Sequence, residues 1–273
     1  MKSGLVTSVL IISLMTTAVP SSAQQQTKSY QTTAFLLMGA ATGTELILKD
    51  RISPPQPRWT AVNALDSHIR ERLVWESAHL AAAAKFSDAL FFGTAAVAAL
   101  YVPLSGDHSL ELLATQSAVV GVTSLMTNAV KIMVARQRPY AHYGTLASQG
   151  LDDNASFFSG HTSLTTAMAV SSAMLLAEGN GWQRSTALVA AGIVGATTAY
   201  FRIAADQHYF SDVLTGAIVG GVLAYWITEW TISNQNPFTE AEIQTPLLIH
   251  IRLPIGFSHS ADDIRLSPRG VYK

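Results

Sequence analysis

Five uncharged segments rich in Ala, Val and Leu follow one another along the chain, and they restrict its fold more than any other feature. Each is 16 to 19 residues long, and the residues that bound them are Asp88 and Asp107, Glu111 and Lys131, His161 and Glu178, Arg184 and Arg202, and Asp212 and Glu229. Segments of this length form helices that are either buried in a core or just long enough to cross a membrane. The sequence therefore predicts an all-α helical bundle.

Composition narrows the class of protein further. The chain has 273 residues, of which 49% are hydrophobic and only 13% charged, so most of it belongs to one predominantly buried body. A formal net charge of -1 and the lack of a basic run make nucleic acid an unsuitable partner. The absence of cysteine excludes disulfides and thiolate metal sites.

The N-terminus has the pattern of a Sec-type signal peptide over residues 1–23. Lys2 precedes an apolar run at residues 5–15, and the small residues of 21–23 come after it. An uncleaved membrane anchor is the alternative, although the run is short for a span. Both alternatives send the rest of the chain across a membrane, which predicts a bacterial-type cell envelope protein.

Three further regions come after the signal. Residues 24–84 form an N-terminal helical region, with one helix at 32–48, a proline-rich break at 53–57 and a surface-lying amphipathic helix at 63–75. Residues 85–234 contain the five segments and form the helical core. Residues 235–273 form a C-terminal appendage, in which 246–253 alternates like one exposed strand and whose role stays open.

Cationic, imidazole and carboxylate side chains stand at the ends of the five segments. They are Lys131, Arg138, His161, Arg202, His208 and Asp212. Because short connections make neighbouring helices antiparallel, all six are expected to converge at one end of the bundle. A single such residue is ordinarily a helix-terminal charge or a structural histidine, whereas six together indicate a functional site.

The stretch 202–212 indicates phosphate chemistry. If the chain is helical from His208 onward, Asp212 lies one turn further on the same face and can orient the imidazole. Arg202 can present its guanidinium to the oxyanion that such an imidazole attacks.

Three motifs in this order resemble the signature of the phosphatidic acid phosphatase type 2 superfamily. They are Lys131-x6-Arg138-Pro139, Ser159-Gly160-His161 and Arg202-x5-His208-x3-Asp212. The superfamily includes bacterial acid phosphatases, membrane lipid phosphatases and vanadium haloperoxidases, and the resemblance covers about residues 85–230. It implies a helical bundle of that kind with the active site at one end. Phe158 and Phe201 depart from the usual pattern, which leaves the shape of the pocket and the subfamily open.

The resemblance also implies a role for each motif residue. His208 attacks phosphorus and forms a phosphohistidine, Asp212 holds its other ring nitrogen, and His161 protonates the leaving oxygen. The residues that bind the phosphoryl oxygens are Lys131, Arg138, Ser159, Gly160 and Arg202. Three cations supply the neutralising charge, so neither a metal nor another cofactor is expected.

Other assignments carry less weight. Asp206, His208 and Asp212 could be imagined as metal ligands, but Asp206 is poorly aimed and no His-Glu-x-x-His motif is present. His142 could reach the mouth of the pocket, and the remaining histidines match no motif. A soluble periplasmic acid phosphatase, a vanadium haloperoxidase and a non-catalytic phosphate-binding envelope protein remain alternatives. The expected substrate is a phosphate ester, preferably of a lipid; the ester itself and the oligomeric state stay open.

Two arguments on membrane topology disagree. Six spans, the N-terminal run and the five segments, place all three motif loops on the outer, periplasmic side, provided that residues 32–48 lie outside without crossing. The loops then assigned to the inside, 105–111 and 178–184, carry one Arg between them, whereas residues 49–85 carry several Lys and Arg. That charge distribution contradicts the positive-inside tendency and suits a soluble bundle. Hydropathy and the parity of the spans favour the membrane form.

Overall fold

The computed structural model describes residues 53–106, 109–177 and 181–235, together with some positions between 32 and 47. The signal at 1–23, the strand at 246–253 and all of the appendage beyond Gln235 lie outside the described residues. All the described residues belong to one unit of the chain.

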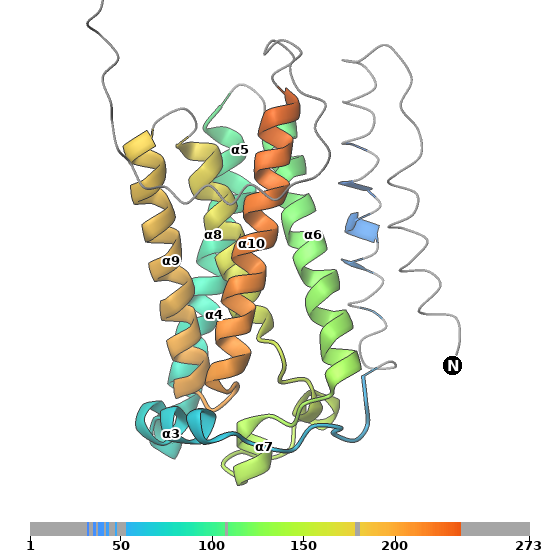
Figure 1. Ribbon diagram of the computed structural model, residues 1–273, viewed down its shortest axis with the longest axis vertical. Coiled ribbons are helices and arrows are strands. Elements are labelled where there is room, and N and C mark those ends of the chain that lie inside the picture. Colours follow the sequence, from blue (N-terminus) through green and yellow to red (C-terminus); the bar gives the residue numbers. More distant parts are fainter. Residues whose placement is uncertain are drawn as a thin grey trace, which may run out of the picture. The chain divides into compact units, whose positions relative to one another are not determined.

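The described chain is helical, which confirms the all-α prediction (Figure 1). Its elements are α3 (Ala64–Leu73), the 3₁₀ turn η1 (Ser77–His79), α4 (Leu80–Ala96), the π-helical turn η2 (Val97–Tyr101), α5 (Val102–Leu104), α6 (Ser109–Val134), α7 (Pro139–Tyr143), the 3₁₀ turn η3 (Gly150–Asn154), α8 (Gly160–Leu176), α9 (Gly181–Ala204) and α10 (Phe210–Gln235). The five uncharged segments lie in the run from α4 to α5 and in α6, α8, α9 and α10.

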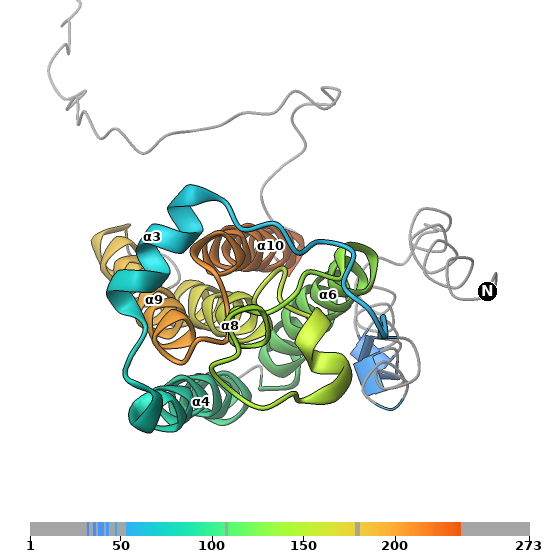
Figure 2. The ribbon, with the colours of Figure 1, turned by 90° about the horizontal axis from the view of Figure 1, so that it is seen from below.

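Helix α8 is the centre of the bundle, because it contacts α4, α6, α9 and α10 (Figure 2). Its buried face is rich in small and hydroxyl side chains. Ser172 Oγ accepts a hydrogen bond from Gln116 Nε2 of α6 at 3.0 Å, and Ser171 Oγ accepts one from Thr228 Oγ1 of α10 at 2.9 Å. Hydroxyl and amide groups that bond between helices are typical of packing inside membranes.

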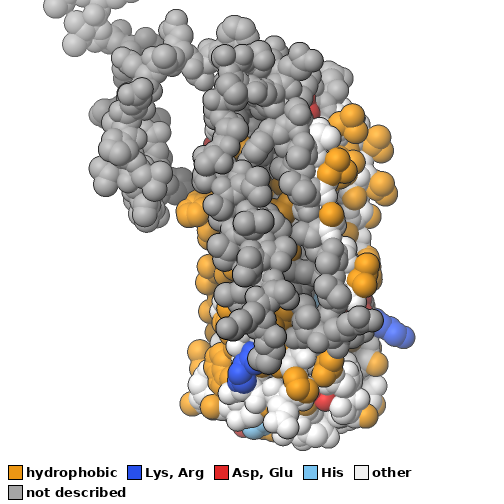
Figure 3. All heavy atoms as spheres, turned by 90° about the vertical axis from the view of Figure 1, so that its right-hand side faces the viewer, with side chains coloured by type: hydrophobic (Ala, Val, Ile, Leu, Met, Phe, Trp, Pro, Cys, Tyr) orange, Lys and Arg blue, Asp and Glu red, His pale blue; other side chains and the backbone are white. Residues whose placement is uncertain are grey.

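The outside of the bundle is apolar. Large hydrophobic side chains such as Phe92, Leu104, Trp182, Ile193 and Trp226 are more than 60% exposed, and Figure 3 shows hydrophobic groups along the flank. Four helical runs are long and apolar enough to cross a membrane: Ser77–Leu104, Ser109–Val134, Gly181–Ala204 and Phe210–Ser233. Only 22% to 33% of the apolar stretch in each run is buried inside the bundle. A bundle with hydroxyl groups inside and apolar groups outside is that of a membrane protein.

Glycines allow α8 to lie very close to its neighbours. A Cβ added to Gly220 of α10 would stand 2.1 Å from the Ser163 carbonyl oxygen, and one added to Gly216 would stand 2.8 Å from the Ser159 carbonyl oxygen. Gly195 of α9 likewise faces Thr166. Close approach between helices therefore occurs at these three glycines. At Gly192 of α9, by contrast, nothing lies within 4 Å of an added Cβ.

Helices α3 and α7 lie across one end of the bundle, called the capped end below (Figures 1 and 2). Helix α3 begins after Asn63, whose side chain accepts a hydrogen bond from the Asp66 backbone N–H and so caps the helix. The predicted helix at 63–75 is thus present, but its assignment to the surface is wrong at Asp66. The Asp66 side chain is fully buried, because it forms an ion pair with Arg136.

The described residues between 32 and 47 are helical, in agreement with the predicted helix at 32–48. Met38 is buried, and a Cβ added to Gly121 in the middle of α6 would stand 3.0 Å from the Met38 Cβ. Met38 therefore packs beside the middle of α6, and the expectation that residues 32–48 lie outside without crossing stays a prediction.

Candidate active site

Helix ends bring the three motifs together at the capped end. Lys131 is in the last turn of α6, Arg138 precedes α7, Ser159 and Gly160 start α8 with His161 beside them, Arg202 is in the last turn of α9, His208 lies in the following loop, and Asp212 is in the first turn of α10. The antiparallel order of the helices accounts for this convergence.

The N-terminus of α8 forms one side of the site. The Ser159 side chain is the N-cap and accepts hydrogen bonds from the Thr162 backbone N–H at 3.4 Å and from the Thr162 hydroxyl at 3.1 Å. A Cβ added to Gly160 would stand 3.7 Å from Lys131 Nζ, so the ammonium group lies beside the start of this helix. A helix N-terminus with an adjacent cation is suited to bind a phosphate group.

Two buried arginines form the opposite side. Arg138 Nη1 donates a hydrogen bond to Gln207 Oε1 at 2.9 Å, and Arg202 Nη2 donates to the same oxygen at 3.5 Å. Arg138 Nε also donates to the Asp152 carbonyl oxygen at 2.8 Å, which fixes the guanidinium. Gln207 therefore holds one oxygen between two guanidinium groups, and sequence reasoning did not identify it because it belongs to no motif position.

The geometry of His208 and Asp212 differs from the helical arrangement expected from their spacing. Helix α10 begins only at Phe210, and the Tyr209 backbone N–H donates to Asp212 Oδ2 at 2.9 Å. Asp212 also accepts hydrogen bonds from Ser156 Oγ at 2.6 Å and Arg136 Nη1 at 2.5 Å. His208 Nδ1 lies 3.8 Å from Asp212 Oδ2, too far for a hydrogen bond, and has no hydrogen-bond partner in the described structure.

The environment of His208 favours the neutral imidazole. Burial lowers the pKa of His208 well below its ordinary value, and the cations of Arg138, Arg202 and Lys131 lower it further, as does His161. A neutral imidazole keeps the lone pair that a nucleophile needs.

His161 lies at the more open side of the site. Its side chain is 34% exposed, its ring centroid is 5.1 Å from that of Phe91, and its Nε2 is 3.0 Å from Asp88 Oδ1 of α4. Both Phe91 and Asp88 precede the three motifs, and sequence reasoning treated Asp88 only as the boundary of an apolar segment.

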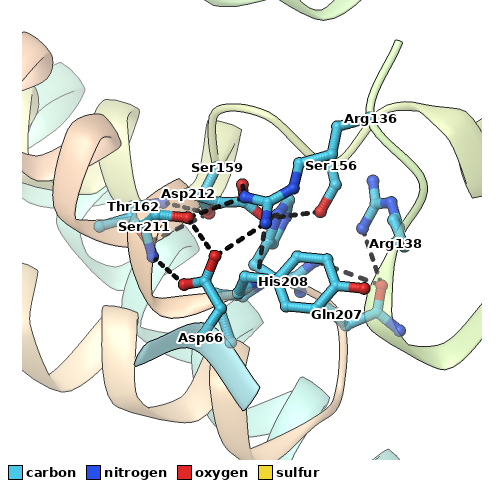
Figure 4. A network of polar contacts seen from close by, with 12 residues as sticks. Asp66, Arg136, Arg138, Ser156, Ser159, Thr162, Gln207, His208, Ser211 and Asp212 are labelled. Carbon is cyan, nitrogen blue, oxygen red and sulfur yellow. Dashed lines mark hydrogen bonds and ion pairs between the residues drawn. The ribbon is translucent and has the colours of Figure 1, made fainter. Parts of the chain in front are cut away.

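A buried charge network connects α3 to the site (Figure 4). Arg136 Nη2 donates to Asp66 Oδ2 at 2.8 Å, while its Nη1 reaches Asp212. The guanidinium lies between the rings of Trp59 and Tyr209, 4.1 and 4.2 Å from their centroids. Sequence reasoning missed Arg136 and Asp66. The available signal was a second arginine, Arg136, inside the Lys131-to-Arg138 motif, at a position where the motif specifies nothing.

Asp206, considered above as a metal ligand, instead binds side chains of α3 and of the loop after α7. Its carboxylate forms two hydrogen bonds of 2.7 Å with Arg70 of α3 and also accepts one from Thr145. The described residues contain no cluster of three or more His, Asp or Glu arranged to hold a metal ion. His142 is exposed and its ring packs against Tyr143 of α7; its place at the pocket mouth stays a prediction.

The two residues that depart from the motifs are part of the packing around the site. Phe158 is only 2% exposed. Phe201 stacks on Phe86 with ring centroids 5.1 Å apart and meets Trp75 edge-on. These rings join α9, α4 and the segment after α3.

The fold and the site define a helical membrane protein with a cluster of cationic side chains at one end of its bundle. The family model of the PAP2 superfamily matches residues 112–235, which confirms the resemblance to this superfamily over that part of the chain. The chain is also similar to the first transmembrane PAP2 type phosphatidylglycerolphosphate phosphatase from Bacillus subtilis, a crystal structure. The identity is 18%, the TM-score is 0.47, and the match covers 74% of this chain and 96% of that one. Comparison with curated proteins finds no match.

Proposed function

We propose that the protein is a metal-independent phosphatase that hydrolyses phosphomonoesters or pyrophosphates of lipids through a phosphohistidine at His208. The observation that carries this proposal is the set of three cations around a buried imidazole. Lys131, Arg138 and Arg202 all act on the pKa of His208 and lower it. The same charges that keep the nucleophile neutral can neutralise a phosphoryl group.

In the first step, His208 attacks phosphorus as the bond to the leaving oxygen breaks. The equatorial oxygens bind to Lys131, to the start of α8 at Gly160 and to the two arginines, with the Gln207 oxygen displaced from between them. His161 gives a proton to the leaving oxygen. The covalent intermediate replaces one displacement that has a high barrier by two displacements with lower barriers.

In the second step, water attacks the phosphohistidine. Neutral His161 takes a proton from the water while the N–P bond breaks and its electron pair returns to His208. Asp212 stabilises the imidazole once it carries positive charge in the intermediate. The 3.8 Å gap between Asp212 Oδ2 and His208 Nδ1 closes to a hydrogen bond as that charge develops.

A groove on the flank of the bundle supports a lipid substrate. It lies between α4, α8 and α9, encloses about 390 Å³ and is lined by small and apolar residues, including Leu90, Gly93, Val97, Ala173, Ala190 and Val194. Its lining begins at Ala89, next to Asp88 and therefore near His161. An acyl or prenyl chain in this groove brings its phosphate to the capped end.

We place the capped end on the periplasmic face of a bacterial-type envelope membrane. With either the N-terminal run or residues 32–48 as the first crossing, the five segments after it bring the number of crossings to six. From an inner N-terminus, this parity puts the capped end outside. The apolar flanks oppose a soluble form.

The test uses protein purified in detergent. Wild type is expected to hydrolyse phosphatidic acid and p-nitrophenyl phosphate in excess chelator. In acid-quenched reactions with ³²P-labelled p-nitrophenyl phosphate, wild type and His161→Ala should carry label on His208, and His208→Ala should carry none. His68→Ala, at an exposed position of α3, is the matched control and should behave like wild type. Loss of activity with chelator, or labelling of His208→Ala, would reject the mechanism.

A further inference from the structure

Asp88 contacts two residues of the proposed active site but has no role in the reaction steps proposed above. Its Oδ1 lies 3.0 Å from His161 Nε2 and 3.9 Å from Arg202 Nη1. The Asp88 side chain is 45% exposed, so it needs no ion pair to remain in the fold. It lies on α4, before the residues 112–235 that match the family model.

Several cations of the site lie near the start of α8, where His161 stands. They are Lys131 of α6, Arg138 before α7 and Arg202 of α9, and His208 lies in the loop after α9. A cation near an imidazole favours its neutral form. A general acid must instead carry the proton before the reaction begins. Asp152 of η3 acts on Arg202, whereas the Asp88 carboxylate is within ion-pair distance of the His161 ring itself.

We infer that Asp88 is the positioning residue that keeps His161 protonated and aimed as the general acid. With Nε2–H directed to Asp88, the proton for the leaving oxygen comes from Nδ1. The P–O bond breaks, its electron pair stays on the leaving oxygen, and that oxygen takes the Nδ1 proton, which leaves His161 neutral. In the second step water returns a proton to Nδ1 while its oxygen bonds to phosphorus, and the N–P bond breaks with its electron pair returning to His208. This inference rests on the proposed phosphatase reaction.

Substrates with different leaving groups distinguish a role of Asp88 in proton transfer from a purely structural role. p-Nitrophenolate is weakly basic and departs without a proton, whereas the alkoxide released from phosphatidic acid needs one. For Asp88→Asn, kcat with phosphatidic acid should fall roughly 100-fold, the lower range of general acid catalysis. With p-nitrophenyl phosphate it should change less than about threefold. The alkaline limb of the kcat profile should move about one unit toward acid, because an opposite charge no longer favours the imidazolium.

The controls use the same end of the bundle. Asp88→Glu restores a carboxylate and should recover the wild-type alkaline limb, whereas Asp88→Ser should behave as Asp88→Asn does. Glu76→Gln removes an exposed carboxylate just before η1 and should change neither readout. Equal losses on both substrates with an unmoved alkaline limb would overturn the role of Asp88. An inactive wild type would instead reject the phosphatase reaction on which it rests.

Discussion

Gln207 holds together the two arginines that we propose bind the phosphate, Arg138 and Arg202. Its side-chain oxygen accepts hydrogen bonds from Arg138 and Arg202, and its side chain is nearly buried. Because the amide is neutral, a phosphate with full negative charge can displace it. The site is thus preorganised without a strong internal competitor.

Replacement of Gln207 by Glu would install such a competitor. A carboxylate between Arg138 and Arg202 forms charge-assisted hydrogen bonds, and a hydrogen bond to a charged group contributes about 1.5–3 kcal/mol. We expect KM for p-nitrophenyl phosphate to rise roughly tenfold or more, with the inhibition constant of inorganic phosphate rising in parallel and kcat changing less. Steady-state kinetics of Gln207→Glu measure this.

The matched control is Gln183→Glu, which adds the same charge at an exposed position in the first turn of α9, at the other end of that helix. Its KM should equal that of wild type. An unchanged KM in Gln207→Glu would show that the two arginines do not bind the phosphate through the position that Gln207 occupies.

The residues found from the sequence and those missed differ in how their partners are specified. Lys131, Arg138 and His161 belong to motifs of fixed spacing, so they could be predicted. Asp66 and Asp88 pair with residues 70 and 73 positions away, and such pairing depends on which helices become neighbours. No spacing in the sequence encodes that choice.

At the scale of elements, α10 packs directly on the backbone of α8 where the site begins. Gly216 faces Ser159 and Gly220 faces Ser163, so the two glycines set the distance between α10 and the first turn of α8. Both Asp212 and Ser159 depend on that distance, because the Ser159 backbone N–H donates to the Asp212 carbonyl oxygen at 3.1 Å.

Gly220→Ala should therefore damage both stability and activity. The added Cβ would stand 2.1 Å from a backbone oxygen, so the helices must separate. Overpacking of this kind costs about 1–3 kcal/mol. We expect a lower Tm in detergent and a fall in kcat of at least roughly tenfold, measured by thermal unfolding and by p-nitrophenyl phosphate hydrolysis.

Gly192→Ala provides the comparison, since its Cβ meets nothing within 4 Å. Alanine is the better helix former, so its Tm should stay unchanged or rise slightly. Similar behaviour of both variants would mean that the close approach of α10 to α8 is not what positions Ser159 and His161.

The long helices could be predicted because charged residues separate the apolar runs, and this separation is visible in the hydropathy of the sequence. The residue at which α10 starts could not be predicted. It depends on the Asp212 carboxylate, which accepts a hydrogen bond from the Tyr209 backbone N–H and not from His208. The place of α3 across the end of the bundle was equally hidden, since its alternating charges have the same pattern whether they face solvent or a buried arginine.

At the scale of the whole molecule, the absence of cysteine makes the orientation measurable. Thr60 is exposed at the capped end, next to Trp59 of the charge network, and Ser105 is exposed after α5 at the opposite end. In intact spheroplasts, a membrane-impermeant maleimide should label Thr60→Cys, and it should label Ser105→Cys only after permeabilisation. The reverse pattern would place the site in the cytoplasm, as the Lys and Arg content of residues 49–85 would favour.

The salt bridges of α3 and α4 limit how the site could be moved to another scaffold. A fragment that starts at Ser109 would carry every recognised motif, yet Arg136 would lack Asp66, Asp206 would lack Arg70, and His161 would lack Asp88. Loss of one partner from a buried ion pair costs roughly 3–5 kcal/mol. The smallest transplantable unit must therefore include the ion-pair partners of these groups, and it begins no later than Asp66, 65 residues before Lys131, the first motif residue.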